Sequence, residues 1–255
     1  HDHLGISKAA NHGLAACRGK WVARLDGDDL AWPDRLEKQL AFVEANDLVC
    51  ASGQVDFIDQ KDRFLITIPS PCDHEGIEEK MLRGHNTIWH SGCMFRRNAA
   101  EQIGGYSEDF DAAIDLDLCL RLGEIGRLGN SMDRVIQYRL HRKSVSAKRR
   151  QYQRDMAKVA CDRAAQRRGI EPCFDAEEMW RPGSDRSSRH DFALRFGWWA
   201  FNSGEKKTAR AYGYAAVATL PWRIDGWRLL VCSIFKNAPQ PQTQHHTPHD
   251  FAHPA

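Results

Sequence analysis

The sequence has little that would mark a membrane-spanning, disulfide-built or zinc-binding protein. No apolar run approaches the ~20 residues that a helix needs to cross a bilayer, and no secretory signal peptide is recognisable. The eight cysteines are scattered and include no Cys-x-x-Cys pair, so neither a zinc site nor a disulfide framework is indicated. Scattered cysteines are typical of a reducing compartment, and we predict a cytoplasmic location.

The chain also lacks an excess of charge, because its 36 Lys and Arg residues nearly balance 34 Asp and Glu residues. No recognised nucleic-acid motif is present either, and we predict no nucleic-acid partner. With 255 residues, 42% of them hydrophobic, the chain can form one sizeable domain plus an appendage. It opens on His1 rather than Met, and we expect an N-terminally truncated chain.

An acidic loop between a strand and a helix is the strongest chemical signal. Residues 21–25 are mostly apolar and predict a buried strand, which ends in Asp26, Gly27, Asp28 and Asp29. In open α/β sheets, ligands bind beyond the carboxyl ends of strands. Adjacent carboxylates repel one another unless a cation neutralises them, and Mg²⁺ or Mn²⁺ prefers oxygen ligands. The loop indicates a divalent metal that carries a diphosphate, or else a solvated acidic turn that caps the next helix.

That next helix is predicted to open at Pro33, whose missing N–H costs nothing in a first turn. Leu36, Leu40 and Val43 follow at helical spacing and predict its buried face. Near the start of the chain, Ser7 is a candidate cap for another short helix.

Further local patterns predict the middle of the chain. Residues 48–58 are rich in β-branched side chains and predict two strands interrupted at Gly53. Residues 76–82 predict a short helix, and residues 128–138 predict a return segment with a turn at Gly129 and Asn130.

A helix with acidic residues in its first turn is expected after residue 113. Ile114, Leu118 and Leu122 lie four apart and form its apolar stripe. Asp115 and Asp117 fall in the first turn, where the helix dipole favours negative charge. Such placement is also common in helices that have no catalytic role.

The acidic loop and its flanks resemble a segment of glycosyltransferase family 2, the inverting transferases with the GT-A fold. In that family an Asp-x-Asp-Asp loop precedes a Pro and then Arg-Leu-x-x-Gln, as residues 26–29, Pro33 and residues 35–39 do here. The resemblance implies an α/β fold, with a GT-A-like (Rossmann-like) mixed sheet flanked by helices, here lacking its first βα units. A helical C-terminal appendage follows.

Further family motifs occur in the same order. Residues 5–19 resemble the helix before the metal strand, and residues 86–97 resemble the segment before the acceptor site. Residues 104–122 resemble the Gly-Gly-Tyr segment and its acidic helix, except that Ile114 replaces a Glu. Residues 138–146 resemble the Tyr-Arg-x-His end of the catalytic domain.

The resemblance implies a metal-dependent, inverting transfer of a sugar from a nucleotide diphosphate donor to a hydroxyl. The acceptor would be a glycan, a lipid-linked or a protein acceptor, as in cell-surface polysaccharide synthesis. The implied roles are a catalytic base at Asp115; Mn²⁺ or Mg²⁺ ligands at Asp26, Asp28 and His141; donor contacts at Asn11, Gly13, Arg24, Asp29 and Arg139; and acceptor contacts at His90, Ser91, Gly104 and Gly105. For His90 a hydrogen-bonded structural histidine remains an alternative, and for His141 a surface histidine.

The last third of the chain changes character. Residues 142–168 are strongly basic and predict a helix stopped by Gly169; its basic face is either solvated or rests on anionic lipid. Helices are expected at 191–199, 206–220 and 224–235, and their tryptophans suit a partner surface or a membrane interface, on the inner face of the plasma membrane. We expect a partial catalytic domain at 1–146, a helical region at 147–236 and a disordered tail at 237–255.

Two rival functions stay open. A strand followed by Asp-Gly-Asp also resembles phosphatases with an aspartyl nucleophile, although these want Thr or Val where the chain has Leu30. The other rival is a truncated, inactive transferase that acts as a helical binding module.

Overall fold

The computed structural model describes residues 5–140, 150–176 and 185–239, which fall into two compact units. The first unit comprises residues 1–55, 70–137 and 148–178, and the second comprises residues 56–69, 138–147 and 179–255. These units divide the chain differently from the boundary expected at residue 146. The long basic helix groups with the first unit, and residues 56–69 group with the C-terminal helices.

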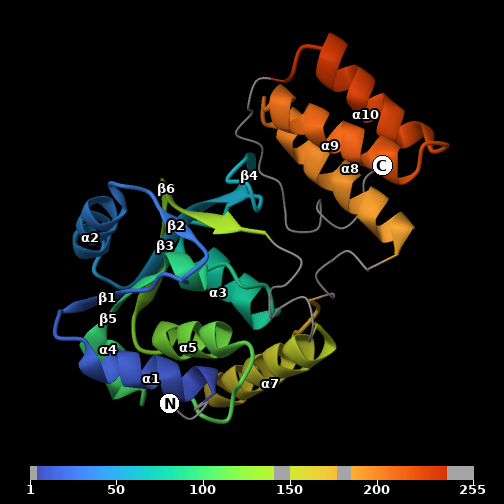
Figure 1. The fold of residues 1–255 in the computed structure, drawn as a ribbon. Coiled ribbons are helices and arrows are strands. Elements are labelled where there is room, and N and C mark those ends of the chain that lie inside the picture. The colour runs from blue at the N-terminus through green and yellow to red at the C-terminus, as the bar shows by residue number, and fades with distance from the viewer. Residues whose placement is uncertain (1–4, 141–149, 177–184, 240–255) are drawn as a thin grey trace. The chain divides into compact units, whose positions relative to one another are not determined.

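In the described part of the chain, helices and strands are interspersed up to β6, and helices alone follow it (Figure 1). Their bounds are α1 Ile6–Ala16, β1 Trp21–Ala23, β2 Leu30–Ala31, α2 Arg35–Ala45, β3 Leu48–Ile58, β4 Phe64–Ile68, α3 His74–Leu82, η1 His90–Gly92, β5 Met94–Arg96, α4 Arg97–Gln102, α5 Ile114–Gly123, β6 Arg127–Arg139, α7 Arg150–Arg168, α8 Arg186–Asn202, α9 Lys206–Thr219 and α10 Ile224–Phe235. The predicted α/β class, a sheet flanked by helices, is confirmed.

The sheet has the strand order β1-β5-β3-β6-β2, and β4 pairs with β3 off this path. β1 is antiparallel to β5, and β5 is antiparallel to β3, so β1 and β3 point the same way. In the β1–β5 register, Ala23 lies opposite Met94 and Trp21 lies opposite Arg96. This register decides which segments continue side by side beyond the carboxyl end of β1.

The two faces of the sheet are covered by different helices. Side chains alternate between the faces of a strand, so neighbours such as Phe95 and Met94 point to opposite sides. Phe95 packs in the largest core with residues of α1, α3, α4, α5 and α7, and Figure 1 shows α1, α5 and α7 together. Met94 packs in a smaller core with Val43 of α2.

Three local predictions were wrong in detail. The strand β1 is not buried: it lies at one end of the strand order, is half-buried at Trp21, and leads to Leu25, which is 43% exposed.

In α2, Leu36 is exposed, whereas Arg35, Gln39 and Val43 form the buried face. Ser7 does not cap α1; it lies inside the helix, buried, and its hydroxyl donates to the Phe110 carbonyl.

Two predicted interruptions of strands are also wrong. β3 runs unbroken through Gly53, and β6 runs unbroken through Gly129 and Asn130. Sheet pairing overrides the local turn preference of these residues. Gly53 is required instead by a close approach: a Cβ there would lie 2.6 Å from the Asp133 carbonyl oxygen and 2.7 Å from Val135 Cγ1.

Replacing Gly53 with alanine is therefore expected to destabilise the protein by roughly 1–3 kcal/mol, the usual cost of overpacking. Gly13→Ala is the matched control, because nothing lies within 4 Å of a Cβ at that position of α1 and a helical Gly→Ala change gains up to about 1 kcal/mol. Urea unfolding of both variants measures the difference. A Gly53→Ala protein as stable as the parent would contradict the close approach.

The second unit has its own core, built by α8, α9 and α10 with Leu65 of β4 and Leu140. Helices were expected at these positions, and the expected bounds 224–235 match α10. Asp185 caps α8, since its side chain accepts from the Ser188 N–H at 2.9 Å. Within the described ranges, no helix combines the length and apolarity needed to cross a membrane. The disordered tail predicted at 237–255 lies largely outside the described residues, which end at 239.

Candidate functional site

The acidic loop lies beside the short turn η1, because the pairing of β1 with β5 continues past the end of both strands. The Arg24 N–H donates to the Cys93 carbonyl at 2.9 Å. Two residues further on, the Asp26 N–H donates to Ser91 Oγ at 3.1 Å. Ser91 is only 2% exposed, so its observed contact is to the acidic loop, and its predicted acceptor contact stays a prediction.

A buried polar pair on α2 fixes both sides of this junction. Arg35 Nη2 donates to the Arg24 carbonyl at 2.7 Å and to the Cys93 carbonyl at 3.2 Å. Its Nε donates to Gln39 Oε1 at 2.7 Å, and Gln39 Nε2 donates to the Gly92 carbonyl at 2.8 Å. The Arg-Leu-x-x-Gln motif therefore braces the acidic loop against η1, a role that sequence reasoning missed.

The carboxylates of the loop differ in their surroundings. Asp26 Oδ1 lies 2.9 Å from Arg24 Nη2, and both side chains are about one-third exposed, at 36% and 34%. Asp28 is exposed, whereas Asp29 is 7% exposed and its N–H donates to the Asp26 carbonyl. Arg24 thus already supplies positive charge to the loop.

His90 connects the loop to the acidic helix. Its Nε2 is hydrogen-bonded to the Tyr106 hydroxyl at 2.9 Å, and the two rings meet edge to face. Burial lowers the pKa of His90; the negative charges of Asp115 and Asp26 oppose that shift, and Arg24 adds to it. Burial likewise raises the pKa of the Tyr106 hydroxyl. At neutral pH the pair is therefore an uncharged imidazole beside an uncharged phenol.

Asp115 sits in the first turn of α5, which follows Ala113 in a left-handed conformation with φ 54°. The carboxylate is half-buried, and its Oδ2 accepts a hydrogen bond from Asn86 Nδ2. Its negative charge favours a higher pKa at both His90 and Tyr106. Asp115 is thus oriented by an amide that cannot take its proton, which suits a general base.

The lowered pKa of His90 makes stability depend on pH. Below the unfolded-state pKa of about 6.5, the unfolded chain gains a proton at this ring that the folded protein does not bind. The contribution of His90 to the free energy of unfolding is therefore fully present above about pH 6.5. It declines as the pH falls towards the lower pKa of the folded state. Urea unfolding across this window should show a shallower slope in His90→Gln than in the parent. His12→Gln, at an exposed position of α1, should keep the parental slope.

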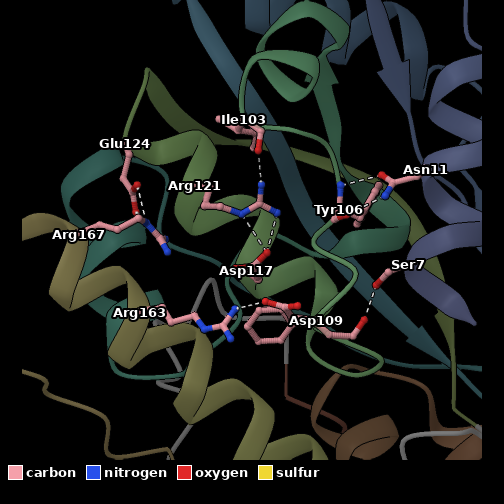
Figure 2. Close-up of polar contacts among 11 residues, drawn as sticks. Ser7, Asn11, Ile103, Tyr106, Asp109, Asp117, Arg121, Glu124, Arg163 and Arg167 are labelled. Atoms are coloured by element: carbon pink, nitrogen blue, oxygen red, sulfur yellow. Dashed lines mark hydrogen bonds and ion pairs between the residues drawn. The ribbon is translucent and has the colours of Figure 1, made fainter.

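Asn11 is hydrogen-bonded to the backbone of Tyr106, as Figure 2 shows. Its Nδ2 donates to the Tyr106 carbonyl at 2.7 Å, and its Oδ1 accepts from the Tyr106 N–H at 2.8 Å. A Cβ on Gly105 would lie 2.6 Å from this Oδ1. Gly104 and Gly105 have φ of 79° and 70° and end α4. The observed contacts make Asn11 a support for Tyr106; its donor contact stays a prediction.

A second polar network lies around α5 and α7 (Figure 2). Asp117, 2% exposed, pairs with Arg121, which also donates to the Ile103 carbonyl. Arg163 pairs with Asp109, and Arg167 forms a two-pronged pair with Glu124. A cavity of about 300 Å³ is lined by Ile103, Gly104, Ser107, Asp117, Arg121, Arg163 and Arg167. Each of its three arginines is paired with a carboxylate, so the network is structural.

The predicted site residues therefore separate into groups. One group gathers at one place: Arg24, Asp26, His90, Ser91 and Asp115. Asn11 binds the backbone of Tyr106, which directly follows Gly105, and the Tyr106 hydroxyl contacts His90. Gly13 is exposed on α1, and Arg139 belongs to the second unit. His141 lies outside the described residues.

Arg139 is engaged within its own unit. Its Nη1 donates to the Asp59 carbonyl at 3.1 Å and pairs with Asp62. A contact of Arg139 with the donor stays a prediction.

The residues present suit a metal that is shared with a diphosphate. Among the residues that the structure describes, no three His, Cys, Asp or Glu side chains gather to hold a metal alone. Asp26 and Asp28 nevertheless offer carboxylates on one tight loop, and Mg²⁺ is usually bound by one or two carboxylates while substrate phosphates supply other oxygens. The loop fits an ion of this kind.

Comparisons with known proteins agree with the motifs. Residues 1–104 match a family model described as glycosyl transferase family 2. The O-antigen biosynthesis glycosyltransferase WbnJ of Escherichia coli is 32% identical over 54% of this chain and 55% of its own length. The putative glycosyltransferase EpsE of Bacillus subtilis is 32% identical over 58% and 52%, and the amylovoran biosynthesis glycosyltransferase AmsE of Erwinia amylovora 29% over 58% and 55%. The chain spans about half the length of these curated relatives.

Solved structures give weaker matches. The mannosyltransferase PcManGT from Pyrobaculum calidifontis, in complex with GDP-Man and Mn²⁺, is 18% identical, covering 89% of this chain and 58% of its own, with a TM-score of 0.45. TarS 1–349 of S. aureus with UDP-GlcNAc is 10% identical over 90% and 60%, with a TM-score of 0.41. Because both scores are low, the assignment rests on the sequence matches. These matches, with the ordered motifs, assign residues 1–104 of the chain to glycosyltransferase family 2.

Proposed function

We propose that the site transfers a sugar, with inversion and with the help of a divalent metal, from a nucleotide diphosphate donor to an acceptor hydroxyl. The observation that carries this proposal is the meeting of the acidic loop with the acidic helix. Asp26 and Asp115 come from segments far apart in the chain. The Asp26 N–H donates to Ser91 Oγ, beside His90, and His90 Nε2 is hydrogen-bonded to the Tyr106 hydroxyl, in the segment that leads to α5. The charges of both carboxylates oppose the lowering of the His90 pKa. A carboxylate for a metal and a carboxylate for a general base would thus lie around one half-buried imidazole.

On the donor side, Asp26 and Asp28 would hold Mn²⁺ or Mg²⁺, and His141 would complete the metal shell. The bound ion would neutralise charge on the departing nucleoside diphosphate. Arg24, beside Asp26 at 2.9 Å, would orient that carboxylate and face the diphosphate. Asn11, Gly13, Asp29 and Arg139 are the further proposed donor contacts.

On the acceptor side, Asp115 would act as the general base. The acceptor oxygen bonds to the anomeric carbon while the bond from that carbon to the diphosphate oxygen breaks, and the acceptor proton passes to Asp115. One displacement inverts the anomeric centre, so no enzyme nucleophile is required. His90, Ser91, Gly104 and Gly105 are the proposed acceptor contacts. We add the hydroxyl of Tyr106 to this proposal, because it is hydrogen-bonded to His90 at 2.9 Å.

A carbohydrate acceptor at the cell surface fits the relatives best. Two of the matched proteins are named for the biosynthesis of O-antigen and of amylovoran. We propose a role in the synthesis of cell-surface polysaccharide or another glycoconjugate. All eight cysteines are free, which is compatible with the reducing compartment predicted from the sequence.

Calorimetric titration with a panel of nucleotide diphosphate sugars tests the donor half of the proposal. Binding is expected only in Mn²⁺ or Mg²⁺, and Asp28→Asn should weaken it by more than about tenfold, since even outer-shell changes at metal sites cost 10–100-fold. Asp34→Asn is the matched control: this exposed residue precedes α2, and asparagine is an equally good residue before a helix. Binding without metal, or equal loss in both variants, would contradict the assigned ligand.

A further inference from the structure

The last described helix, α10, presents an apolar face to solvent. Ile224, Trp227, Val231, Ile234 and Phe235 are all exposed, from 37% at Ile234 to 79% at Phe235. At 100° per residue these positions share one side of the helix. The opposite side carries buried residues, including Leu229 and Cys232, which pack in the core of the second unit.

This face is larger than scattered surface hydrophobics would explain. Twelve residues at 1.5 Å per residue give a stripe about 18 Å long, and Trp222, 71% exposed, extends it before the helix begins. The indole N–H of Trp227 already has a partner, because Nε1 donates to the Pro221 carbonyl at 2.8 Å. Contiguous apolar patches with a polar rim typically mark contact surfaces.

The rim is cationic. Residues 185–239 contain nine Lys and Arg against four Asp and Glu, a net charge of +5. Arg228 is the charged residue within the exposed face, and its guanidinium lies 5.9 Å from the centre of the Trp198 ring. Arg186 lies over the ring of Trp222 at 5.6 Å, and exposed Lys236 directly follows the helix.

We propose that the α10 face, defined by Ile224, Trp227, Val231, Ile234 and Phe235, docks on an anionic lipid bilayer. An amphipathic helix with aromatic residues on one side and a basic rim lies in the interface plane of such a membrane. Each basic residue near an anionic surface adds to the attraction. The chain would thereby be held at the membrane surface.

Other occupants fit the same face less well. A second copy would bring two copies of residues 185–239 together, each with a net charge of +5, and like charges oppose that association. Residues 240–255 have one large apolar side chain, Phe251, among polar and His residues, which is too few to cover the stripe. The basic helix α7 is a weaker lipid-binding candidate than expected, because Arg163, Arg167 and Arg168 pair with carboxylates of the first unit.

Co-sedimentation of the full chain with vesicles tests the proposal. Binding is expected to vesicles of phosphatidylcholine mixed with phosphatidylglycerol and to be much weaker with phosphatidylcholine alone. The double variant Trp227→Ser/Phe235→Ser should reduce the partition coefficient at least about tenfold, because it removes large apolar side chains from the contact. Arg228→Gln and Lys236→Gln should each reduce it roughly fivefold.

Tyr214→Ser is the matched control, since Tyr214 is a 58% exposed aromatic residue on α9 outside this face, and it should bind like the parent. Circular dichroism checks that each variant is folded. Unchanged binding in the double variant, or no binding of the parent, would overturn the proposal. If the parent sediments as a dimer, the double variant sediments as a monomer and neither binds vesicles, the face would be assigned to a second copy. No donor is needed, so the result is independent of the proposed transfer.

Discussion

Asp115→Asn is expected to lower the turnover number for sugar transfer by about 10²–10⁴, the usual contribution of a positioned general base. The amide keeps the size of the side chain but cannot accept the acceptor proton. Donor binding should persist, because Asp115 lies on α5 and not in the acidic loop. Steady-state transfer assays combined with donor titration separate the two effects.

Asp117→Asn supplies the control for this prediction. Asp117 lies two residues further along α5 and is 2% exposed, but its carboxylate is bound to Arg121. Its replacement should lower stability, since a buried charge loses its partner, while the folded enzyme keeps its turnover number. A turnover number for Asp115→Asn within a few-fold of the parent would remove this residue from the catalytic role.

Much of the helical structure follows from local sequence. The stripe of Ile114, Leu118 and Leu122 gives α5 its buried side, and Pro221 and the apolar run after it define α10. Where local signals were weak, long-range pairing decided the outcome. Gly53 and Gly129 carry turn preferences, but each lies inside a long strand where its missing side chain makes room for a neighbour.

The face of α2 shows why periodicity alone can mislead. Leucines at helical spacing predicted a buried stripe, yet Leu36 is 58% exposed and Arg35 is 2% exposed. The buried backbone carbonyls of Arg24, Gly92 and Cys93 need donors, and an arginine–glutamine pair supplies them. Such a requirement arises only after distant segments have met, so a pattern within one helix does not reveal it.

The sequence motifs named residues of the proposed site but not the residues that support them. Asp26, His90 and Asp115 were named from motifs, and their roles stay predictions. Asn86 and Tyr106 orient them through contacts that span 29 and 16 residues of sequence. Both lie inside segments that resemble the family, next to chemically more conspicuous neighbours. Their roles become visible only through hydrogen-bond partners.

Arg35→Met is expected to destabilise the protein by roughly 2–4 kcal/mol. It removes the guanidinium donors to the Arg24 carbonyl and to Gln39 Oε1, and an unsatisfied buried acceptor costs about 1–3 kcal/mol. The Cys93 carbonyl keeps its hydrogen bond from the Arg24 N–H. Methionine fills a similar apolar volume, so the loss reports hydrogen bonds more than a cavity. Urea unfolding measures the stability, and the same sample tests metal-dependent donor binding, which should weaken because the acidic loop loses its brace.

Lys38→Met is the control on the same helix. Lys38 is 46% exposed and pairs at the surface with Asp34 and Asp133, so its loss should leave both readouts near the parental values.

Gln39→Leu offers a graded test, because it removes the donor to the Gly92 carbonyl but leaves the bonds from Arg35 to Arg24 and Cys93. Its effect should fall between the other two. If Arg35→Met instead matched Lys38→Met in stability and donor binding, the Arg-Leu-x-x-Gln motif would have no role in positioning the acidic loop.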